Sequence, residues 1–362
     1  MLGWNDLKQF AIPATWDAGE ITRFRLVDGT NYDAWLNDVA QGLAIVNGEL
    51  VGDPLIGGLV SVTDEMMVEY RTGTTTGFQV ASEYSRPDPQ RGATTGHMLP
   101  LIPFDRQMGW TWMMLRKARR AQLDADIAAA MSDVRDLWHR RVLTRFFQSA
   151  ADTVGGTGVS APFADGGTAD TNYVPIAVPE RGGTFNNTHQ HYLFLDGINQ
   201  ANVETATAHI WEHGHDPVYE MLVSYADLAA WTNTTNVTGY VPKGSSLIAY
   251  GNQVDLALVD PSFQGVIDTE LGTLRMRTNG RIPTGYWGIY RAFGPGDLRN
   301  PLRVRVSEYG VGAVLLAGDH IRNHPLENAI MFSEFGVGIG EDRTAAVLVR
   351  NDPAAYADPT IS

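Results

Sequence analysis

The sequence predicts an α+β fold organised around one long helix. Residues 116–150 form the longest stretch with a continuous helical pattern, and they include neither glycine nor proline. At about 1.5 Å per residue, a helix over this stretch would be about 50 Å long, longer than an ordinary compact domain needs. The chain before it has strand patterns and many turn-forming residues, whereas the chain after it alternates between helix and strand patterns.

Apolar residues recur on one side of this helix at about 100° per residue, with aspartate and arginine opposite. The apolar positions are Leu123, Ile127, Ala130, Met131, Val134, Leu137, Trp138, Val142 and Phe146. Leu143 and Phe147 lie outside that set, so we expect the last third of the helix to be buried on two sides. The first half should stay partly exposed or face another subunit. We expect Gly155 and Gly156 to end the helix.

The composition is that of a globular protein large enough to bury a sizeable core, with 362 residues of which 44% are hydrophobic. The absence of cysteine excludes disulfides, thiolate metal sites and a cysteine nucleophile. A formal charge of −14 argues against a dedicated nucleic-acid-binding protein, which would need a basic face. Because the chain lacks a secretory signal and any run of roughly 18 apolar residues, we expect a soluble protein made in a cytoplasm, with no membrane partner.

The chain ahead of the long helix has two parts. Residues 1–58 contain short amphipathic pieces, including a helix at 32–40, and a turn signal at 46–48. This stretch is too discontinuous for a core of its own, so we expect an arm that lies on another subunit. Residues 59–104 carry strand patterns on both sides of a polar tip at 85–96, which predicts a long hairpin. Such a hairpin cannot bury both faces within one chain, and this favours a partner.

The chain after the long helix begins with a Gly/Thr/Asp-rich stretch that predicts a loop over 155–183. Helices are expected at 202–213 and 225–231. Strands are expected at 218–224, 246–250, 254–259, 272–278, 286–293, 302–309 and 345–350. The glycine-rich stretch 336–340 is expected to be a bend that leads into the last strand.

The strongest candidate for chemistry is a pair of histidines in the helix at 202–213. His209 and His213 are four residues apart, a spacing that can bind zinc from one helix face. Glu212 directly precedes the second histidine, so we expect it to point off that face. Gly214 is typical of the residue after a helix, and histidine in the last turn is favoured by the helix dipole. The dipole accounts for His213 without a metal.

Two further histidines lie within reach in the sequence. His189 and His191 can add ligands, but two alternating histidines on a short strand are equally ordinary. We therefore expect no metal and no cofactor. A metal-dependent hydrolase that uses His209, His213 and Asp216 remains the alternative from another class of function.

No other motif predicts catalysis. There is no G-x-S-x-G elbow, and the glycine-rich stretch 336–340 lacks the Lys-Ser/Thr of a phosphate-binding loop. We therefore predict that the protein is not an enzyme and has no catalytic residues. An arm, a hairpin without support and an overlong helix indicate an assembly subunit. The arginines expected at its interfaces are Arg86, Arg91, Arg116, Arg119 and Arg120.

This order of elements resembles the major capsid proteins of tailed bacteriophages, which have the Hong Kong ninety-seven fold. Residues 272–290 are similar to a strand, Pro-Gly turn and strand of the axial domain in that family, and residues 332–349 to its C-terminal end. The resemblance implies an N-terminal arm at 1–58, an extended loop at 59–105, a peripheral domain at 106–194 with a spine helix at 114–150, an axial domain at 195–318, and a peripheral return with the C-terminal strand at 319–362.

The resemblance implies hexamers and pentamers of an icosahedral shell that encloses double-stranded DNA, within a virion assembled in the host cytoplasm. No lysine occurs in 59–105, so the covalent cross-link known in the family should be absent. No long charged helical segment precedes the arm, which implies a separate scaffolding protein. A portal and a decoration protein are further expected partners, and an acidic wall should contact DNA weakly. The alternative within this fold is an encapsulin-like shell with protein cargo.

Overall fold

The structure is a computed structural model of the 362-residue chain. It describes residues 26–73, 78, 80–81, 83–84, 92–153, 160–167, 173–243, 260–294, 296–317, 326–352 and 354–362. The chain divides into two compact units, each made from three separate stretches. Unit 1 consists of Met1–Leu50, Pro103–Asp136 and Tyr309–Glu334; unit 2 consists of Val51–Ile102, Leu137–Glu308 and Phe335–Ser362.

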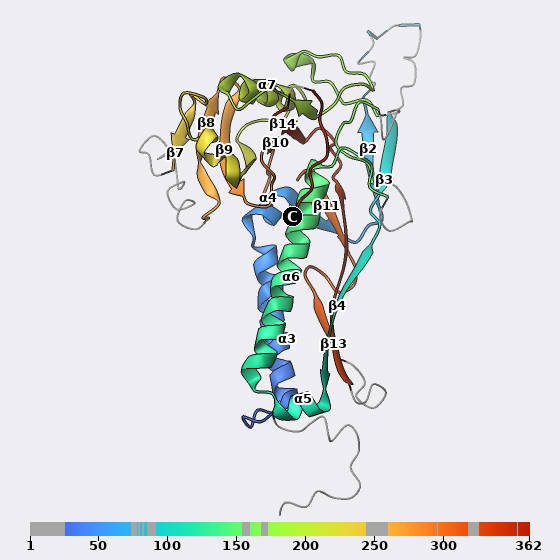
Figure 1. The fold of residues 1–362 in the computed structure, drawn as a ribbon. Coiled ribbons are helices and arrows are strands. Elements are labelled where there is room, and N and C mark those ends of the chain that lie inside the picture. Colours follow the sequence, from blue (N-terminus) through green and yellow to red (C-terminus); the bar gives the residue numbers. More distant parts are fainter. Residues whose placement is uncertain are drawn as a thin grey trace, which may run out of the picture. The chain divides into compact units, whose positions relative to one another are not determined.

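In unit 1, helix α3 (Tyr32–Val51) lies beside the first half of helix α6 (Arg120–Phe147) (Figure 1). One side of α3 is apolar at helical spacing, with Trp35, Val39, Leu43, Val46 and Leu50 buried. The Trp35 indole N–H donates to Asp124 of α6 over 2.7 Å. The remaining described elements of unit 1 are α5 (Trp112–Lys117), β4 (Ile102–Thr111), β12 (Val314–Ala317) and the first part of β13 (Leu326–Ile339).

The turn predicted at 46–48 is wrong, because Asn47 and Gly48 lie inside α3. The Asn47 side chain donates to the backbone oxygen of Ala313 over 2.9 Å and accepts from its N–H over 3.0 Å. Those bonds occupy the amide that would otherwise compete for the helix backbone. The glycine costs about 1 kcal/mol. Burial of the apolar side of α3 offsets this cost, because tertiary packing supplies most helical stability.

The single helix predicted over 116–150 is two helices, α5 and α6, separated by Ala118 and Arg119. Ala118 is extended, with φ −73° and ψ 150°. The Asp28 carboxylate accepts the backbone N–H of Arg120 over 2.7 Å, so a residue remote in sequence caps the start of α6. The glycine pair at 155–156 does not end the helix, because α6 already stops at Phe147.

The end of α6 lies in unit 2, where the C-terminal segment covers it. Tyr356 donates to the carbonyl of Phe147 over 2.6 Å, and the Asp358 carboxylate accepts the Ser149 N–H over 2.7 Å. The first of these bonds satisfies a carbonyl that a helix end leaves free, and the second gives the Ser149 N–H a partner just beyond the helix. As predicted, Leu143 and Phe147 are both buried, so the last turns of α6 are covered on two sides.

Most of unit 2 is a seven-stranded sheet in the order β5-β14-β10-β6-β9-β8-β7. Its strands are β5 (Tyr192–Phe194), β14 (Ala346–Arg350), β10 (Tyr286–Tyr290), β6 (Tyr219–Ser224), β9 (Gly272–Asn279), β8 (Phe263–Thr269) and β7 (Tyr240–Pro242). Helix α7 (Gln200–Trp211) covers one face of the sheet, and its buried side packs into the same apolar core as the strands (Figure 1). The last strand of the chain therefore shares a sheet with strands from the segment predicted to be axial.

Unit 2 also contains the predicted hairpin. Strands β2 (Met67–Thr72) and β3 (Ala93–Met98) pair antiparallel, with Met67 opposite Met98. Strand β1 (Val60–Thr63) follows helix α4 (Pro54–Leu59) and runs parallel to β11 (Leu302–Val306). The short elements η1 (Pro179–Arg181), η2 (Tyr225–Asp227) and α8 (Leu228–Trp231) complete it. The strands predicted at 246–250 and 254–259 lie outside the described residues.

The bend predicted at 336–340 is wrong, because Gly336 and Gly338 lie within the 14-residue strand β13. A Cβ on Gly336 would sit 1.9 Å from the Pro100 carbonyl oxygen, and one on Gly338 would sit 2.2 Å from a Leu99 methyl. These glycines therefore allow another segment to lie directly on the strand backbone. No described helix is long and apolar enough to cross a membrane.

Candidate assembly surfaces and a buried histidine cluster

Of the five arginines predicted at interfaces, the structure describes the side chains of two, Arg119 and Arg120. Arg86 and Arg91 lie outside the described residues, as does the side chain of Arg116 in α5. Arg119 is exposed. Arg120 pairs within the chain, with Asp38 over 2.9 Å and with Asp124 over 3.3 Å. Its described contacts join α3 to α6 inside unit 1, and the interface role of all five remains a prediction.

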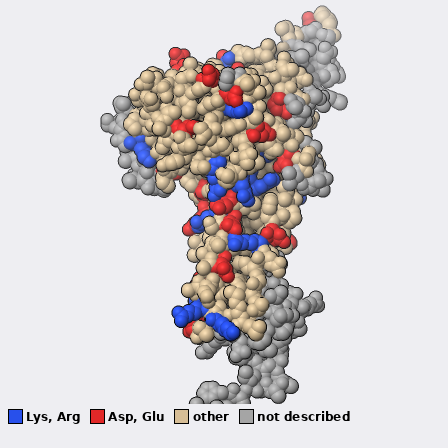
Figure 2. All heavy atoms as spheres, viewed as in Figure 1, with Lys and Arg blue, Asp and Glu red and all other residues tan. Residues whose placement is uncertain are grey.

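Acidic and basic side chains are interspersed on the face drawn in Figure 2. In unit 1 the pairs across neighbouring elements are Arg106–Asp133, Arg120–Asp38 and Arg135–Glu49. Exposed pairs of this kind contribute about 0–1 kcal/mol each. These pairs therefore place opposite charges on neighbouring elements of unit 1, but they contribute little to the stability of the fold.

Large apolar side chains are exposed along the hairpin. Val62, Met66 and Met67 are between 43% and 49% exposed at its base; we call these three residues the hairpin base. Towards the tip, Phe78 and Tyr84 are more than 90% exposed. Contiguous apolar surface on a soluble protein usually marks an interaction site. These exposed apolar side chains make the hairpin a candidate surface for contact with a partner.

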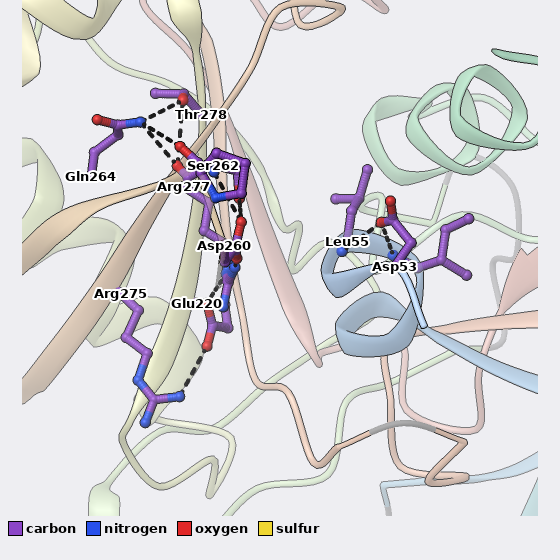
Figure 3. A network of polar contacts seen from close by, with 11 residues as sticks. Asp53, Leu55, Glu220, Asp260, Ser262, Gln264, Arg275, Arg277 and Thr278 are labelled. Atoms are coloured by element: carbon purple, nitrogen blue, oxygen red, sulfur yellow. Dashed lines mark hydrogen bonds and ion pairs between the residues drawn. The ribbon is translucent and has the colours of Figure 1, made fainter. Parts of the chain in front are cut away.

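A network of charged side chains crosses strands β6 and β9 in unit 2 (Figure 3). Glu220 accepts from Arg277 over 2.7 Å and from Arg275 over 3.3 Å, and Asp260 pairs with Arg277. Asp260 also accepts the Ser262 hydroxyl over 2.6 Å. The two carboxylates and two guanidinium groups balance one another, which keeps buried charge paired.

This network lines a cavity of about 650 Å³ that also reaches the start of α4. There Asp53 caps the helix and accepts the N–H of Leu55 over 2.8 Å (Figure 3). Because each charged group of the network already has a partner of opposite charge, we assign the network to the stability of the sheet.

Four histidines from two separate segments meet in unit 2. His189 and His191 lie just before β5, whereas His209 lies in the last turn of α7 and His213 directly follows its C-cap. His213 Nε2 lies 2.9 Å from His189 Nε2 and 3.1 Å from His191 Nε2. The His189 and His209 rings stack with centroids 4.6 Å apart. We call these four residues with Glu212 the histidine cluster.

Glu212 faces this cluster, contrary to the prediction that it points away. Its Oε1 lies 3.4 Å from His209 Nδ1, 3.5 Å from His189 Nε2 and 3.7 Å from His213 Nε2. The residue is the C-cap of α7, where the helix ends, and its flexible side chain turns back towards the rings. Neighbouring residues on a helix need not diverge when one of them has a long side chain.

Backbone carbonyls fix the orientation of two rings. His191 Nδ1 lies 2.8 Å from the Ala346 oxygen, and His209 Nε2 lies 2.7 Å from the Gln190 oxygen. A carbonyl accepts, so each of these nitrogens carries the proton, which leaves His191 Nε2 and His209 Nδ1 with free lone pairs. His191 Nε2 faces His213 and His209 Nδ1 faces Glu212, so both lone pairs point towards other residues of the histidine cluster.

Burial keeps these histidines neutral. It lowers the pKa of His189 to about 4 and that of His213 to about 3, and it lowers the pKa of His191 well below its usual value. Burial also raises the pKa of Glu212. The cause is the cost of placing charge in a poorly solvated site. Neutral imidazoles are the protonation state that binds metal.

Asp216, the third residue of the alternative hydrolase site, is not part of this cluster. Its side chain is 72% exposed and pairs with Arg181. His215, two residues after His213, bonds instead to Thr344 over 3.2 Å. His209, His213 and Asp216, which the hydrolase alternative requires, therefore do not come together, whereas His189 and His191 do lie beside His209 and His213.

The long helix, the β hairpin, the seven-stranded sheet and the long strand β13 together define the Hong Kong ninety-seven fold, as the sequence predicted. A solved structure from Mycobacterium phage Patience is similar over 96% of this chain and 97% of that chain, with a TM-score of 0.64 and 20% sequence identity. No family model matches the sequence, and no curated protein matches it.

Two further solved structures are similar at lower TM-scores. One is the mature capsid of bacteriophage PhiM1, with a TM-score of 0.49, 11% identity, and coverage of 81% of this chain and 85% of that chain. The other is the holo-SrpI encapsulin complex from Synechococcus elongatus PCC 7942, with a TM-score of 0.46, 12% identity, and coverage of 99% and 98%.

Proposed function

We propose that the protein is the major capsid protein of a tailed bacteriophage, a structural subunit of the icosahedral shell around double-stranded DNA. The observation that carries this proposal is the fold, which matches a phage structure over nearly the full length of both chains. The chain combines a hairpin, a long helix and a sheet, and we infer that these elements serve contacts between subunits of a shell. We infer that its role is structural and not enzymatic.

The exposed apolar residues of the hairpin support assembly of the chain with itself. The hairpin base and the aromatic residues near the tip are large, apolar and accessible in the single chain. Stable protein interfaces bury at least about 1,000 Å² and contain an apolar centre. We infer that the hairpin lies on a neighbouring subunit and that hexamers and pentamers form through such contacts.

The division into arm, extended loop, peripheral domain, axial domain and return remains part of this proposal. So do a separate scaffolding protein, a portal, a decoration protein and location in the virion. The absence of lysine from 59–105 means that non-covalent contacts must hold the extended loop. The charge of −14 favours weak contact with packaged DNA, because phosphate binding depends on basic side chains.

An encapsulin-like shell with protein cargo is the second candidate, since the same fold serves both kinds of shell. The contents of purified particles distinguish the two. Nuclease-resistant double-stranded DNA supports the capsid, and a co-purifying enzyme in DNA-free particles supports the compartment. The hydrolase alternative is disfavoured because Asp216 is exposed and paired with Arg181, away from the histidines.

The test is electron microscopy of the full chain, expressed alone and with the structural proteins of its phage. We expect closed icosahedral shells. Met67→Glu places a charge on the hairpin base, where Met67 is 49% exposed, and should abolish shells while the chain stays folded. Met67→Leu keeps the apolar surface and should assemble normally. Monodisperse monomers of the wild-type chain under all these conditions would overturn the proposal.

A further inference from the structure

We propose that the histidine cluster is a structural zinc site. The ligands are three imidazoles and one carboxylate. His189, His191 and His213 have ring nitrogens within 4.8 Å of one another. Glu212 Oε1 lies close to two of these nitrogens, those of His189 and His213. His209 lies beside them, with its Nδ1 3.4 Å from Glu212 Oε1. This site is independent of the proposed shell function.

Four of the six distances between the ligand atoms are close to those around a tetrahedral ion. Four ligands at about 2.0–2.1 Å from zinc are separated from one another by about 3.3 Å. The two histidine pairs that share His213 Nε2 measure 2.9 Å and 3.1 Å, and the two distances from Glu212 Oε1 measure 3.5 Å and 3.7 Å. Ring rotations of a few tenths of an ångström would bring these four distances to the tetrahedral value.

Hydrogen bonds among the described residues do not satisfy this group of atoms. His213 Nε2 faces two imidazole nitrogens, and a single proton on it can point at only one of them. Glu212 Oε1 is buried and has no hydrogen-bond partner within the described part of the chain. No arginine or lysine of the described residues lies in ion-pair range of Glu212. A divalent cation would supply the missing positive charge.

The surrounding contacts have the form expected around metal ligands. A ligand histidine usually donates its other ring N–H to a carbonyl or carboxylate, which fixes the tautomer. His191 does this through Nδ1 to Ala346 of β14, so its Nε2 lone pair is held towards the cluster. The side chains of His191 and His213 are almost fully buried, so the direction of both lone pairs is set by packing.

The chemistry of the set favours zinc as a structural ion. Imidazole and carboxylate ligands suit zinc, and the chain offers no cysteine for softer metals. Four protein ligands leave no open position for water, which separates this site from a catalytic one. The ion would join the segment before β5 to the end of α7, two segments about 20 residues apart in the sequence. The site would therefore stabilise this edge of unit 2.

The experiment titrates the full, untagged chain with Co²⁺ after removal of metals by EDTA, because tetrahedral Co²⁺ absorbs strongly in the visible range. We expect one Co²⁺ per chain, displaced by Zn²⁺. His191→Gln and Glu212→Gln should each weaken binding at least about tenfold. His215→Gln is the matched control, since His215 is similarly buried but bonds to Thr344. It should bind as the wild type does.

Thermal unfolding gives a second measurement. EDTA should lower the midpoint temperature of the wild type and of His215→Gln, and leave that of Glu212→Gln unchanged. If His191→Gln fails to fold, Glu212→Gln still decides the question, because its side chain is 28% exposed and the change keeps its size. The proposal would be overturned if the wild type and Glu212→Gln showed equal visible absorption of bound Co²⁺. It would also be overturned if EDTA changed the midpoint temperature of both proteins equally.

Discussion

The indole of Trp138 and the ring of Phe335 stack with centroids 4.0 Å apart and planes 14° from parallel. They come from α6 and from β13, and both are buried. The contact joins the longest described helix to the longest described strand, at the point where each enters unit 2. Part of the apolar side predicted for the long helix is therefore buried against β13, a strand that the sequence did not predict.

Removal of one ring from this stack should destabilise unit 2. Phe335→Ala is expected to lower the free energy of unfolding by about 3–5 kcal/mol, because it removes a buried aromatic ring and leaves a cavity. Chemical denaturation of the unassembled subunit measures the change. Phe332→Ala, on the same strand at a half-buried position, should cost distinctly less. Equal losses at both positions would contradict the central role of the stack.

The end of α6 should not tolerate a charge. Phe147→Asp places a carboxylate at a site that is fully buried, and the expected result is an insoluble or unfolded chain. Ala129→Asp introduces the same group at an exposed position of α6 and should cost less than about 1 kcal/mol. Soluble expression and circular dichroism compare the two variants. A folded Phe147→Asp subunit that assembles would show that this end of the helix is not enclosed.

Arg343 is a buried arginine that holds several segments of unit 2 together. It donates to the Pro162 carbonyl over 2.7 Å, pairs with Asp165 and stacks over the Tyr173 ring. Arg343→Met should lower the free energy of unfolding by about 3–5 kcal/mol, because the nearly buried Asp165 loses its partner.

Arg299→Met is the matched control for this variant. Arg299 also pairs with an aspartate, Asp297, but its side chain is 68% exposed. Loss of that pair should cost about 0–1 kcal/mol. Urea midpoints of the two variants and the wild type provide the comparison, and a small effect at Arg343 would refute the assigned role.

His97 should make stability depend on pH. Burial, together with the nearby charges of Arg145, Arg343 and Arg303, lowers its pKa to about 3. Its Nε2 donates to the Ile339 carbonyl over 3.0 Å. The unfolded chain binds a proton near pH 6.5 while the folded chain does not, so stability should fall as the pH drops from 6.5 towards 3.

His97→Gln removes this titration and keeps an N–H donor for Ile339. The slope of unfolding free energy against pH below 6.5 should then be shallower than in the wild type, by up to about 1.4 kcal/mol per pH unit. Denaturant midpoints at several pH values measure it. Parallel profiles for the two proteins would exclude His97 as the source.

The helical spacing of apolar residues predicted the burial of α6 and the position of α7, because each depends on residues close in sequence. The break at Ala118 was missed because its cause is a cap from Asp28, 92 residues away from Arg120. Strand β13 was missed for a related reason. Gly336 suggests a bend when read locally, and only the approach of Pro100 explains it.

The histidine cluster was half visible in the sequence. The spacing of His209 and His213 pointed to a metal site, and the helix dipole offered a sufficient explanation without one. The missing information was the pairing of β5 with β14, which places His191 against α7. Helical geometry also gave the wrong direction for Glu212. The angle between neighbouring residues on a helix does not determine where the carboxylate of a long, flexible side chain lies.

The division of the chain into interleaved stretches sets when folding can be completed. Unit 1 needs residues 309–334 and unit 2 needs residues 335–362, so both depend on the last sixth of the sequence. A ribosome delivers the chain from its N-terminus. Unit 1 can therefore close only after residues 309–334 have emerged and unit 2 only after residues 335–362, so we expect a chain that stops before residue 309 to yield no independently folded half.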